Sequence, residues 1–332
     1  MPTCRSRAHR TRYTRGLTFS AALAVAVACG LLGIRPLRAG ADVLVAQTDE
    51  PTPVSAYGEV LAWSAYENGN YQLMVKVGSN VGAVPTPPQP RAFDASVDLD
   101  QNKAPVVLFS RCRRYSGNPS QLLFGGSASG CRIDQYNVGS GVVQPMALGQ
   151  RPGESFTDPS QWGSRVAVVA TSRRGQVRIE TISLPSGRRS VLPGGTLSHG
   201  LVNSLRIVGG RVAATWYAAR GLETEVVLDT LSGTREILEE GEQGTRTSPQ
   251  IANPTGSEFF GAGLSGAEAY WVEPGDPLIG TPSVVEFYDP LTQTSTVGEG
   301  VPDVFSVAPD GAALYYSTGS NAGGCPCGVF QR

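Results

Sequence analysis

Lysine and histidine are almost missing from this sequence of 332 residues, which contains two of each. The lysines are Lys76 and Lys103, and only His199 lies beyond residue 41. A single histidine excludes a histidine-rich zinc site. An excess of positive charge is missing as well, because residues 42–332 contain 20 basic and 28 acidic residues. This acidic balance argues against binding to the phosphates of a nucleic acid.

Helical periodicity is also missing, since no window beyond residue 42 keeps it over three turns. The sequence contains 41 glycines and 24 prolines, about a fifth of the chain, and these separate short runs rich in Val, Leu, Tyr and Trp. Such alternation is typical of strands joined by tight turns. With 40% hydrophobic residues the chain can bury a sizeable core. We therefore predict an all-β fold.

The first 41 residues have the pattern of a secretory signal peptide. Arginines dominate residues 1–16, residues 17–34 carry no charge, and small residues precede Ala41. We predict a signal peptide over residues 1–41, cut after Ala41, and a mature domain over residues 42–332 in an extracytoplasmic location. Two alternatives stay open, an uncleaved membrane anchor and a lipoprotein modified at Cys29. We expect the protein to associate with a membrane only if its N-terminus is uncleaved or lipidated in one of these two ways.

Two repeated patterns predict the architecture. Turn glycines Gly141, Gly187 and Gly233 are spaced 46 residues apart, and each separates two β-prone runs. Half a period away lies a turn followed by an apolar strand, whose copies start near residues 58, 104, 163, 209, 266 and 310. A four-stranded unit that recurs every 40 to 50 residues is typical of a β-propeller. We predict six four-stranded blades, and residues 43–47 as the strand that closes the ring by pairing the chain's two ends.

The last repeat carries a family resemblance. Residues 302–319 contain a Pro309-Asp310-Gly311 turn before an apolar strand, and Thr247-Ser248-Pro249 is a related turn. These turns resemble the repeats of TolB-like β-propellers. The resemblance implies a propeller fold and a tendency to bind proteins outside the cytoplasm.

Four cysteines lie in the predicted mature chain. Cys112 and Cys131 bracket an inserted loop between two strands, which in an oxidising compartment favours a disulfide between them. Cys325 and Cys327 flank a proline, and a strained local bridge, two thiols or a bridge elsewhere all stay open. No second closely spaced pair of cysteines accompanies Cys325 and Cys327, so we expect no zinc site.

Two further motifs are weak. The glycines of residues 261–266 match a dinucleotide-binding loop, but a strand follows where a helix is required, so we interpret them as a turn. Asp98, Asp100 and Asn102 begin like a calcium loop, but Lys103 replaces its glycine and Phe109 its glutamate. We interpret this segment as a solvated loop.

The sequence also gives little support for a serine-hydrolase triad or for a ligand-binding site built from tryptophans. His199 lies among glycines without a nucleophile elbow, which predicts an exposed connection. Trp63, Trp216 and Trp271 recur at one position of the repeat, which predicts packing in the core.

These observations favour a secreted or envelope-associated binding module that is not an enzyme and carries no cofactor or metal. Its partner would be a protein or a cell-wall component, recognised by the insertions at residues 112–131 and 274–282. The alternative is a propeller hydrolase or lyase acting on peptides or saccharides through channel carboxylates such as Asp158, Asp229 or Asp310. Two carboxylates at catalytic distance in an open channel would favour the enzyme, and a channel closed by arginine would argue against it. The sequence gives no indication of an oligomeric state.

Overall fold

The computed structural model describes residues 42–115, 128–193, 200–218, 223–242, 260–265, 268–273, 282–301, 304–310, 313–318 and 327–332. The chain divides into two units, Met1–Gly40 and Ala41–Arg332, and all described residues belong to the second. The predicted signal peptide, its cleavage after Ala41 and the alternative at Cys29 lie outside the described residues. Every regular element in the described ranges is a β-strand, and no helix there is long and apolar enough to cross a membrane.

Four separate four-stranded sheets are present among the described residues. The first contains β2 (Val54–Tyr57), β3 (Val60–Glu67), β4 (Asn70–Val77) and β5 (Asn80–Ala83). The second contains β16 (Gly200–Val208), β17 (Arg211–Ala218), β18 (Glu223–Thr230) and β19 (Arg235–Glu242). The third contains β20 (Phe260–Ser265), β21 (Glu268–Glu273), β22 (Ser283–Asp289) and β23 (Thr294–Val301). The fourth joins β24 (Val304–Asp310), β25 (Ala313–Thr318), β26 (Gly328–Gln331) and the N-terminal β1 (Val43–Gln47).

A fifth sheet has eight strands. One half contains β11 (Val142–Pro145), β10 (Arg132–Asn137), β7 (Pro105–Arg111) and β6 (Ser96–Leu99). The other half contains β12 (Ser155–Trp162), β13 (Arg165–Thr171), β14 (Val177–Ser183) and β15 (Arg189–Val191). A small hairpin of β8 (Arg114–Tyr115) and β9 (Ala128–Ser129) lies between β7 and β10 in sequence.

The expectation of six separate blades therefore needs correction. The strands that we assigned to two separate blades form one continuous sheet, because Trp162 of β12 and Leu99 of β6 make a parallel bridge. This bridge is the only pairing described between the halves, and within each half the strands pair antiparallel. The two halves also pack against each other through a buried apolar cluster that includes Leu108 and Val168.

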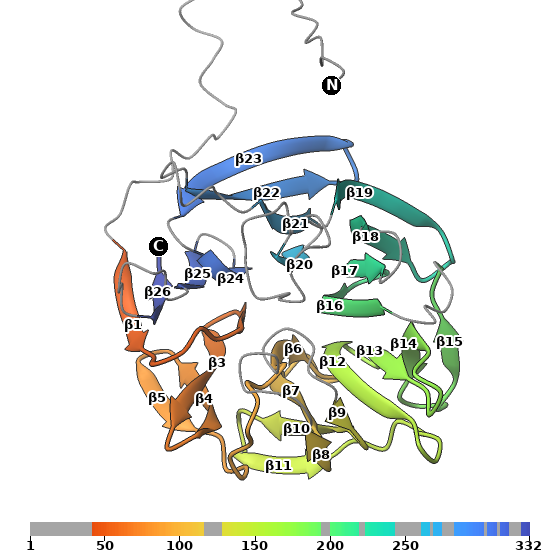
Figure 1. Ribbon diagram of the computed structural model, residues 1–332, viewed down its shortest axis with the longest axis horizontal. Helices are drawn as coiled ribbons and strands as arrows, with labels where there is room; N and C mark the ends of the chain where they lie inside the picture. Colours follow the sequence, from red (N-terminus) through yellow and green to blue (C-terminus); the bar gives the residue numbers. More distant parts are fainter. Residues whose placement is uncertain are drawn as a thin grey trace, which may run out of the picture. The chain divides into compact units, whose positions relative to one another are not determined.

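The sheets are arranged as a propeller. The first strand of each four-stranded unit lies at the centre in Figure 1, and these strands contact one another in the closed cycle β2, β6, β12, β16, β20, β24 and again β2. The outer strands β5, β11, β15, β19 and β23 lie at the rim. Side chains that meet at the centre therefore come from distant parts of the sequence.

The apolar strands found in the sequence are the second strands of the units: β3, β7, β13, β17, β21 and β25. They carry the core, since neighbouring sheets cover both of their faces. Trp63, Trp216 and Trp271 lie on β3, β17 and β21 and are 1 to 4% exposed, so the prediction that they pack in the core is confirmed. Their position in the repeat explains why the same residue type recurs.

The ring is closed by the pairing that the sequence predicts. Strand β1 pairs antiparallel with β26, from Val43 opposite Gln331 to Gln47 opposite Gly328. The Arg332 guanidinium donates from Nε to Asp42 Oδ1 at 2.7 Å and from Nη2 to Oδ2 at 2.9 Å. The closing sheet is thus built from both ends of the described chain.

The repeated glycines occupy turns that need left-handed backbone. Gly141, Gly187 and Gly233 have φ of 71°, 65° and 101° and connect the third and fourth strands of their units. A side chain is strained at such φ values, which explains why glycine recurs at these three turns. The glycines at 261 and 263 differ from our interpretation, because they lie in strand β20 and not in a turn.

Candidate functional site

The inner strands are irregular where they face the centre. The pairing register shifts between Thr157 and Ser160 in β12, and between Asn203 and Arg206 in β16. Within these bulges Asp158 has φ of 47° and Ser204 has φ of 56°, unusual values for residues other than glycine. Bulges and such strained residues frequently occur beside functional sites because they redirect side chains.

A pocket of about 110 Å³ opens among these inner strands. We call it the axial pocket and define it by six of its lining residues: Arg91, Asp94, Asp158, Arg206, Tyr270 and Ser306. They come from the loop before β6, from β12, β16, β21 and β24. The pocket thus joins most of the units of the propeller at one place.

Asp94 holds two backbone segments together. Its Oδ1 accepts a hydrogen bond from the Ser110 amide of β7, and its Oδ2 accepts one from the Asp158 amide of β12, each at 2.7 Å. Bonds from backbone amides to a charged carboxylate are among the stronger hydrogen bonds in proteins. Asp94 therefore stabilises the bulge that carries Asp158.

Asp158 titrates in an unusual range. Burial and the neighbouring Asp94 carboxylate raise the pKa of Asp158 to about 7, against the opposing effects of Arg91 and the Thr157 hydroxyl. A buried carboxyl group beside a second carboxylate ionises less readily. Asp158 can therefore hold or release a proton near neutral pH.

Arg206 closes the centre of the ring. From β16 it reaches β2 and β6, where Nη1 donates to Ser55 Oγ at 2.8 Å and to Ser96 Oγ at 2.9 Å, and Nη2 donates to the Ala56 carbonyl at 3.3 Å. Its Nη1 also lies 3.6 Å from Asp98 Oδ1. The Nε of Arg206 is buried and has no hydrogen-bond partner among the described residues.

The interpretation of residues 98–102 as a solvated loop is wrong for Asp98. This residue lies in β6, is 2% exposed, and accepts a hydrogen bond from Ser160 Oγ at 3.0 Å. Burial raises the pKa of Asp98, and Arg206 and its hydrogen bonds counteract that rise in part. Asp100 does lie in the loop, where its Oδ1 accepts hydrogen bonds from the amides of Asn102 and Ala104. Among the described residues no cluster of His, Cys, Asp and Glu could hold a metal ion.

The three channel carboxylates predicted from the sequence do not meet. Only Asp158 lines the axial pocket. Asp229 on β18 pairs with Arg235, which donates to its two oxygens at 2.8 and 2.7 Å. Asp310 Oδ1 accepts a hydrogen bond from the Gly58 amide at 3.0 Å, beside a separate shallow pocket. Asp94, the real neighbour of Asp158, was missed because it lies in a loop that has no motif.

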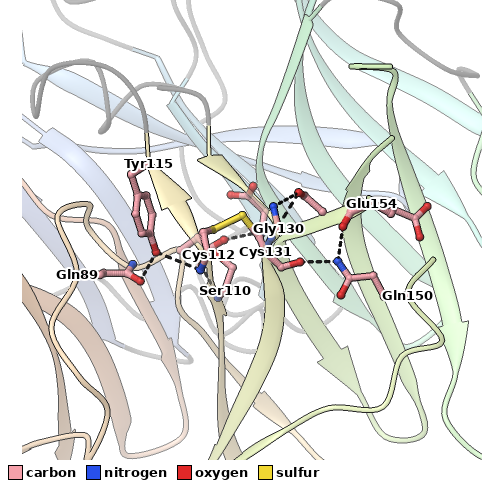
Figure 2. Close-up of a disulfide and its surroundings, with 11 residues drawn as sticks. Gln89, Ser110, Cys112, Tyr115, Gly130, Cys131, Gln150 and Glu154 are labelled. Carbon is pink, nitrogen blue, oxygen red and sulfur yellow. Dashed lines mark hydrogen bonds between the residues drawn. A yellow bond between two sulfur atoms is a disulfide. The ribbon is translucent and has the colours of Figure 1, made fainter. Parts of the chain in front are cut away.

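The Cys112–Cys131 disulfide expected from the sequence is present in the structure. Figure 2 shows it between the end of β7 and the start of β10, with Tyr115 and Gln89 on one side and Gln150 and Glu154 on the other. The Tyr115 hydroxyl donates to Gln89 at 2.6 Å. These contacts anchor the base of the inserted loop, of which residues 116–127 lie outside the described residues.

Other predicted positions fall partly outside the described residues. His199, Cys325 and residues 274–281 are not described. Cys327 is buried immediately before β26. The predictions for the exposed connection at His199 and for the state of the Cys325 and Cys327 pair stay predictions.

No family model matches the chain, and no curated protein matches it. Several solved structures are similar. TolB from Acinetobacter baumannii is 13% identical, with 76% of this chain and 56% of TolB covered and a TM-score of 0.45. A puromycin-hydrolysing peptidase from Mycobacterium tuberculosis is 15% identical, with 86% and 51% covered and a TM-score of 0.49. A chain of a nidogen/laminin complex is 16% identical, with 84% and 86% covered and a TM-score of 0.44.

The chain spans about half the length of the TolB and peptidase chains. Similarity at such low sequence identity is informative about the fold and does not establish an activity. The propeller assignment rests on the strand order and on the closed cycle of inner strands. In fold, the chain is a β-propeller that resembles TolB-like propellers loosely and no single member in particular.

Proposed function

We propose that this protein is an extracytoplasmic binding module without catalytic activity, whose partner is a protein or a cell-wall component. The observation that carries the proposal is the arginine at the centre. Arg206 bridges β16 to β2 and β6 through three hydrogen bonds, and it lines the axial pocket. A small polar pocket whose walls are tied together by these hydrogen bonds supports recognition of a partner more than turnover of a substrate.

The hydrogen bonds of Asp94 support the same proposal. Both of its oxygens accept backbone amides, so the carboxylate is committed to holding β7 and β12 together. A hydrolytic pair needs one carboxylate as acid and a second as base or nucleophile. Asp94 is therefore less available than Asp158 to act as an acid, a base or a nucleophile.

The location outside the cytoplasm is part of the proposal. The Cys112–Cys131 bond supports it, because disulfides persist in oxidising compartments. The sequence pattern of residues 1–41 supports it independently.

We also interpret the eight-stranded sheet as two blades, which makes six in all. Its halves share one bridge, at Trp162 and Leu99, and pack face to face through an apolar cluster, as the separate sheets do. The inner strands β6 and β12 take successive places in the central cycle.

A propeller hydrolase is the second candidate, and the pair Asp94 and Asp158 is the observation that favours it. Burial and Asp94 raise the pKa of Asp158 to about 7, a value suited to a general acid or base at neutral pH. This candidate predicts turnover of a peptide or saccharide that Asp158→Asn abolishes. Glu67→Gln is the matched control, since Glu67 lies exposed at the end of β3.

Cross-linking in the native cell envelope tests the binding module. Lysine-directed reagents would report on two side chains only, Lys76 and Lys103, so a carboxyl-directed reagent is required. We expect one partner in near-equal amount, cross-linked to acidic residues on the pocket side and lost when the protein is unfolded first. Recovery of the protein alone, together with turnover that depends on Asp158, would overturn the proposal.

A further inference from the structure

We propose that the axial pocket binds the zwitterionic α-amino-carboxylate group of a small amino acid. The ammonium would lie at the end formed by Asp94 and Asp158, and the carboxylate at the end formed by Arg206 and Tyr270. The inference rests on the proposed function and names the chemical class of its ligand. The group can belong to a free amino acid or can be carried at the end of a longer chain.

The pocket has two ends of different charge. Asp94, in the loop before β6, lies beside Asp158, because its Oδ2 accepts a hydrogen bond from the Asp158 amide at 2.7 Å, and Arg91 of the same loop also lines the pocket. Burial raises the pKa of Tyr270, and Arg206 is the charged group that acts on it. Carboxyl groups thus dominate one end, and a guanidinium and a phenol form the other.

Two polar groups at the basic end have no hydrogen-bond partner among the described residues. Tyr270 is 7% exposed and lines the pocket, and its hydroxyl forms no hydrogen bond within the described part of the chain. Arg206 is 9% exposed, and its Nε–H is also without an acceptor among the described residues. Both groups are donors that could bind a ligand that accepts hydrogen bonds, and for the buried Arg206 Nε–H such a bond would also remove the free-energy cost of an unpaired donor. A carboxylate has two such oxygens.

The acidic end can receive a donor. Each oxygen of Asp94 accepts one backbone amide, which leaves it a second lone pair. The carboxyl group of Asp158 forms no salt bridge with any described arginine or lysine. An ammonium has three N–H groups and would bind both carboxylates.

The volume limits the ligand. A cavity of about 150 Å³ is enough for benzene in an engineered protein. The axial pocket has about 110 Å³, which suits glycine or alanine and excludes a large side chain. A divalent cation is a poorer match, because calcium takes six to eight oxygen ligands and the described residues gather no such cluster.

Protonation of Asp158 should be coupled to binding. The charged groups around it are Asp94 and Arg91 on the loop before β6, and Arg206 of β16 lines the far end of the pocket. An ammonium favours the ionised carboxylate, so binding would release a proton. Affinity should then rise by up to about tenfold from pH 6 to pH 8, because Asp158 ionises between these values.

Calorimetric titration of the full-length protein with L-alanine and D-alanine tests the inference. We expect binding of at least one enantiomer. Ethylamine and propionate each carry one of the two charges, and each should bind about tenfold more weakly. Nε-Acetyl-lysine carries the same head group on a long tail, so its binding would show that a chain can extend from the pocket. Binding of alanine without binding of acetyl-lysine would indicate a free amino acid.

Two variants assign the ends of the ligand. Asp158→Asn should weaken alanine binding about tenfold and remove its pH dependence, and Tyr270→Phe should weaken it at every pH. Glu67→Gln and Tyr66→Phe are matched controls outside the pocket and should leave the affinity unchanged. Thermal unfolding of each variant shows that the fold is kept.

The inference is overturned if alanine binds no better than ethylamine and propionate, or if calcium binds at Asp158 and alanine does not. Success of the envelope cross-linking together with failure of the alanine titration would reject the ligand class and leave the binding module standing. Asp158-dependent turnover would reject the binding module itself, whatever the outcome of the alanine titration.

Discussion

Arg206 and Asp98 form a buried pair of opposite charges at the centre of this propeller. Their side chains are 10% and 2% exposed, and their closest charged atoms lie 3.6 Å apart. Breaking a buried ion pair by removing one partner is costly because it leaves a charge uncompensated. Removing both charges costs much less.

We therefore expect Arg206→Met to lower the free energy of unfolding by about 3 to 5 kcal/mol at pH 7. Adding Asp98→Asn to this variant should recover part of the loss, because the buried carboxylate is then gone. Urea denaturation of the wild type, the two single variants and the double variant measures both effects. A double variant less stable than Arg206→Met would contradict this account of the pair.

The environment of Glu154 should make part of the protein's folding stability depend on pH. Burial opposes its ionisation, but bonds from Arg189 and from the Arg151 amide, with the charge of Arg178, keep the pKa of Glu154 below its usual value. The Arg178 and Arg189 guanidinium groups lie 2.7 and 2.8 Å from its Oε1. A lowered pKa stabilises the fold above the unfolded pKa of about 4.3, and this contribution is lost as the pH falls through the folded pKa.

Glu154→Gln should therefore cost about 1 to 3 kcal/mol at pH 7, and its difference from the wild type should shrink as the pH falls below the unfolded pKa of about 4.3 and through the folded pKa. Denaturant midpoints measured from pH 7 to pH 3 follow this change. Glu67→Gln, which alters an exposed glutamate on β3, should show no difference at any pH. A gap that stays constant with pH would show that the charge of Glu154 is not the cause.

At the scale of the element, the pairing of β1 with β26 depends on a glycine. A Cβ at Gly328 would lie 2.9 Å from a ring carbon of Phe330 and 3.1 Å from Leu44 Cδ1. Both distances are shorter than ordinary contacts, so Gly328→Ala would force the two strands apart or move the ring. Gly82 in strand β5 has nothing within 4 Å of such an atom and provides a control.

We expect Gly328→Ala to lower the unfolding free energy by about 1 to 3 kcal/mol, as for overpacking in a core. Amide hydrogen exchange should speed up in β1 and β26 before other strands are affected. Gly82→Ala should stay within about 0.5 kcal/mol of the wild type. Equal losses in both variants would mean that strand propensity and not crowding decides the effect.

At the scale of the whole molecule, the propeller is closed by a strand from the other end of the described chain. Without β1, the edge of β26 would expose unpaired amides and carbonyls, and exposed edges promote association between chains. A chain of residues 48–332 should therefore self-associate more than a chain of residues 42–332 does. Light scattering after gel filtration compares the two.

Adding a peptide of residues 42–47 to the shortened chain provides the control. The peptide restores the partner of β26 and the pairing of Asp42 with Arg332, so it should reduce association. A shortened chain that is as monomeric and as stable as the longer one would show that the ring does not need this strand.

The sequence alone determined the elements of this protein. The strand patterns, the turn glycines at 141, 187 and 233 and the closing strand at residues 43–47 are all local signals, and each has the predicted position. These elements could be predicted because a tight turn restricts which residues can occupy it, and a strand buried on both faces needs a run of apolar residues. The Cys112–Cys131 pair belongs to the same class, since its loop is bounded by neighbouring strands.

Only the tertiary structure decided what lies at the centre. Asp98 was assigned to a solvated loop and is buried beside Arg206, which is more than a hundred positions away. Asp94 meets Asp158 because the loop before β6 lies against the inner strand β12 of a different repeat, at the point where β12 has a bulge. No pattern within one repeat encodes these contacts, because each depends on how the ring brings separate repeats together.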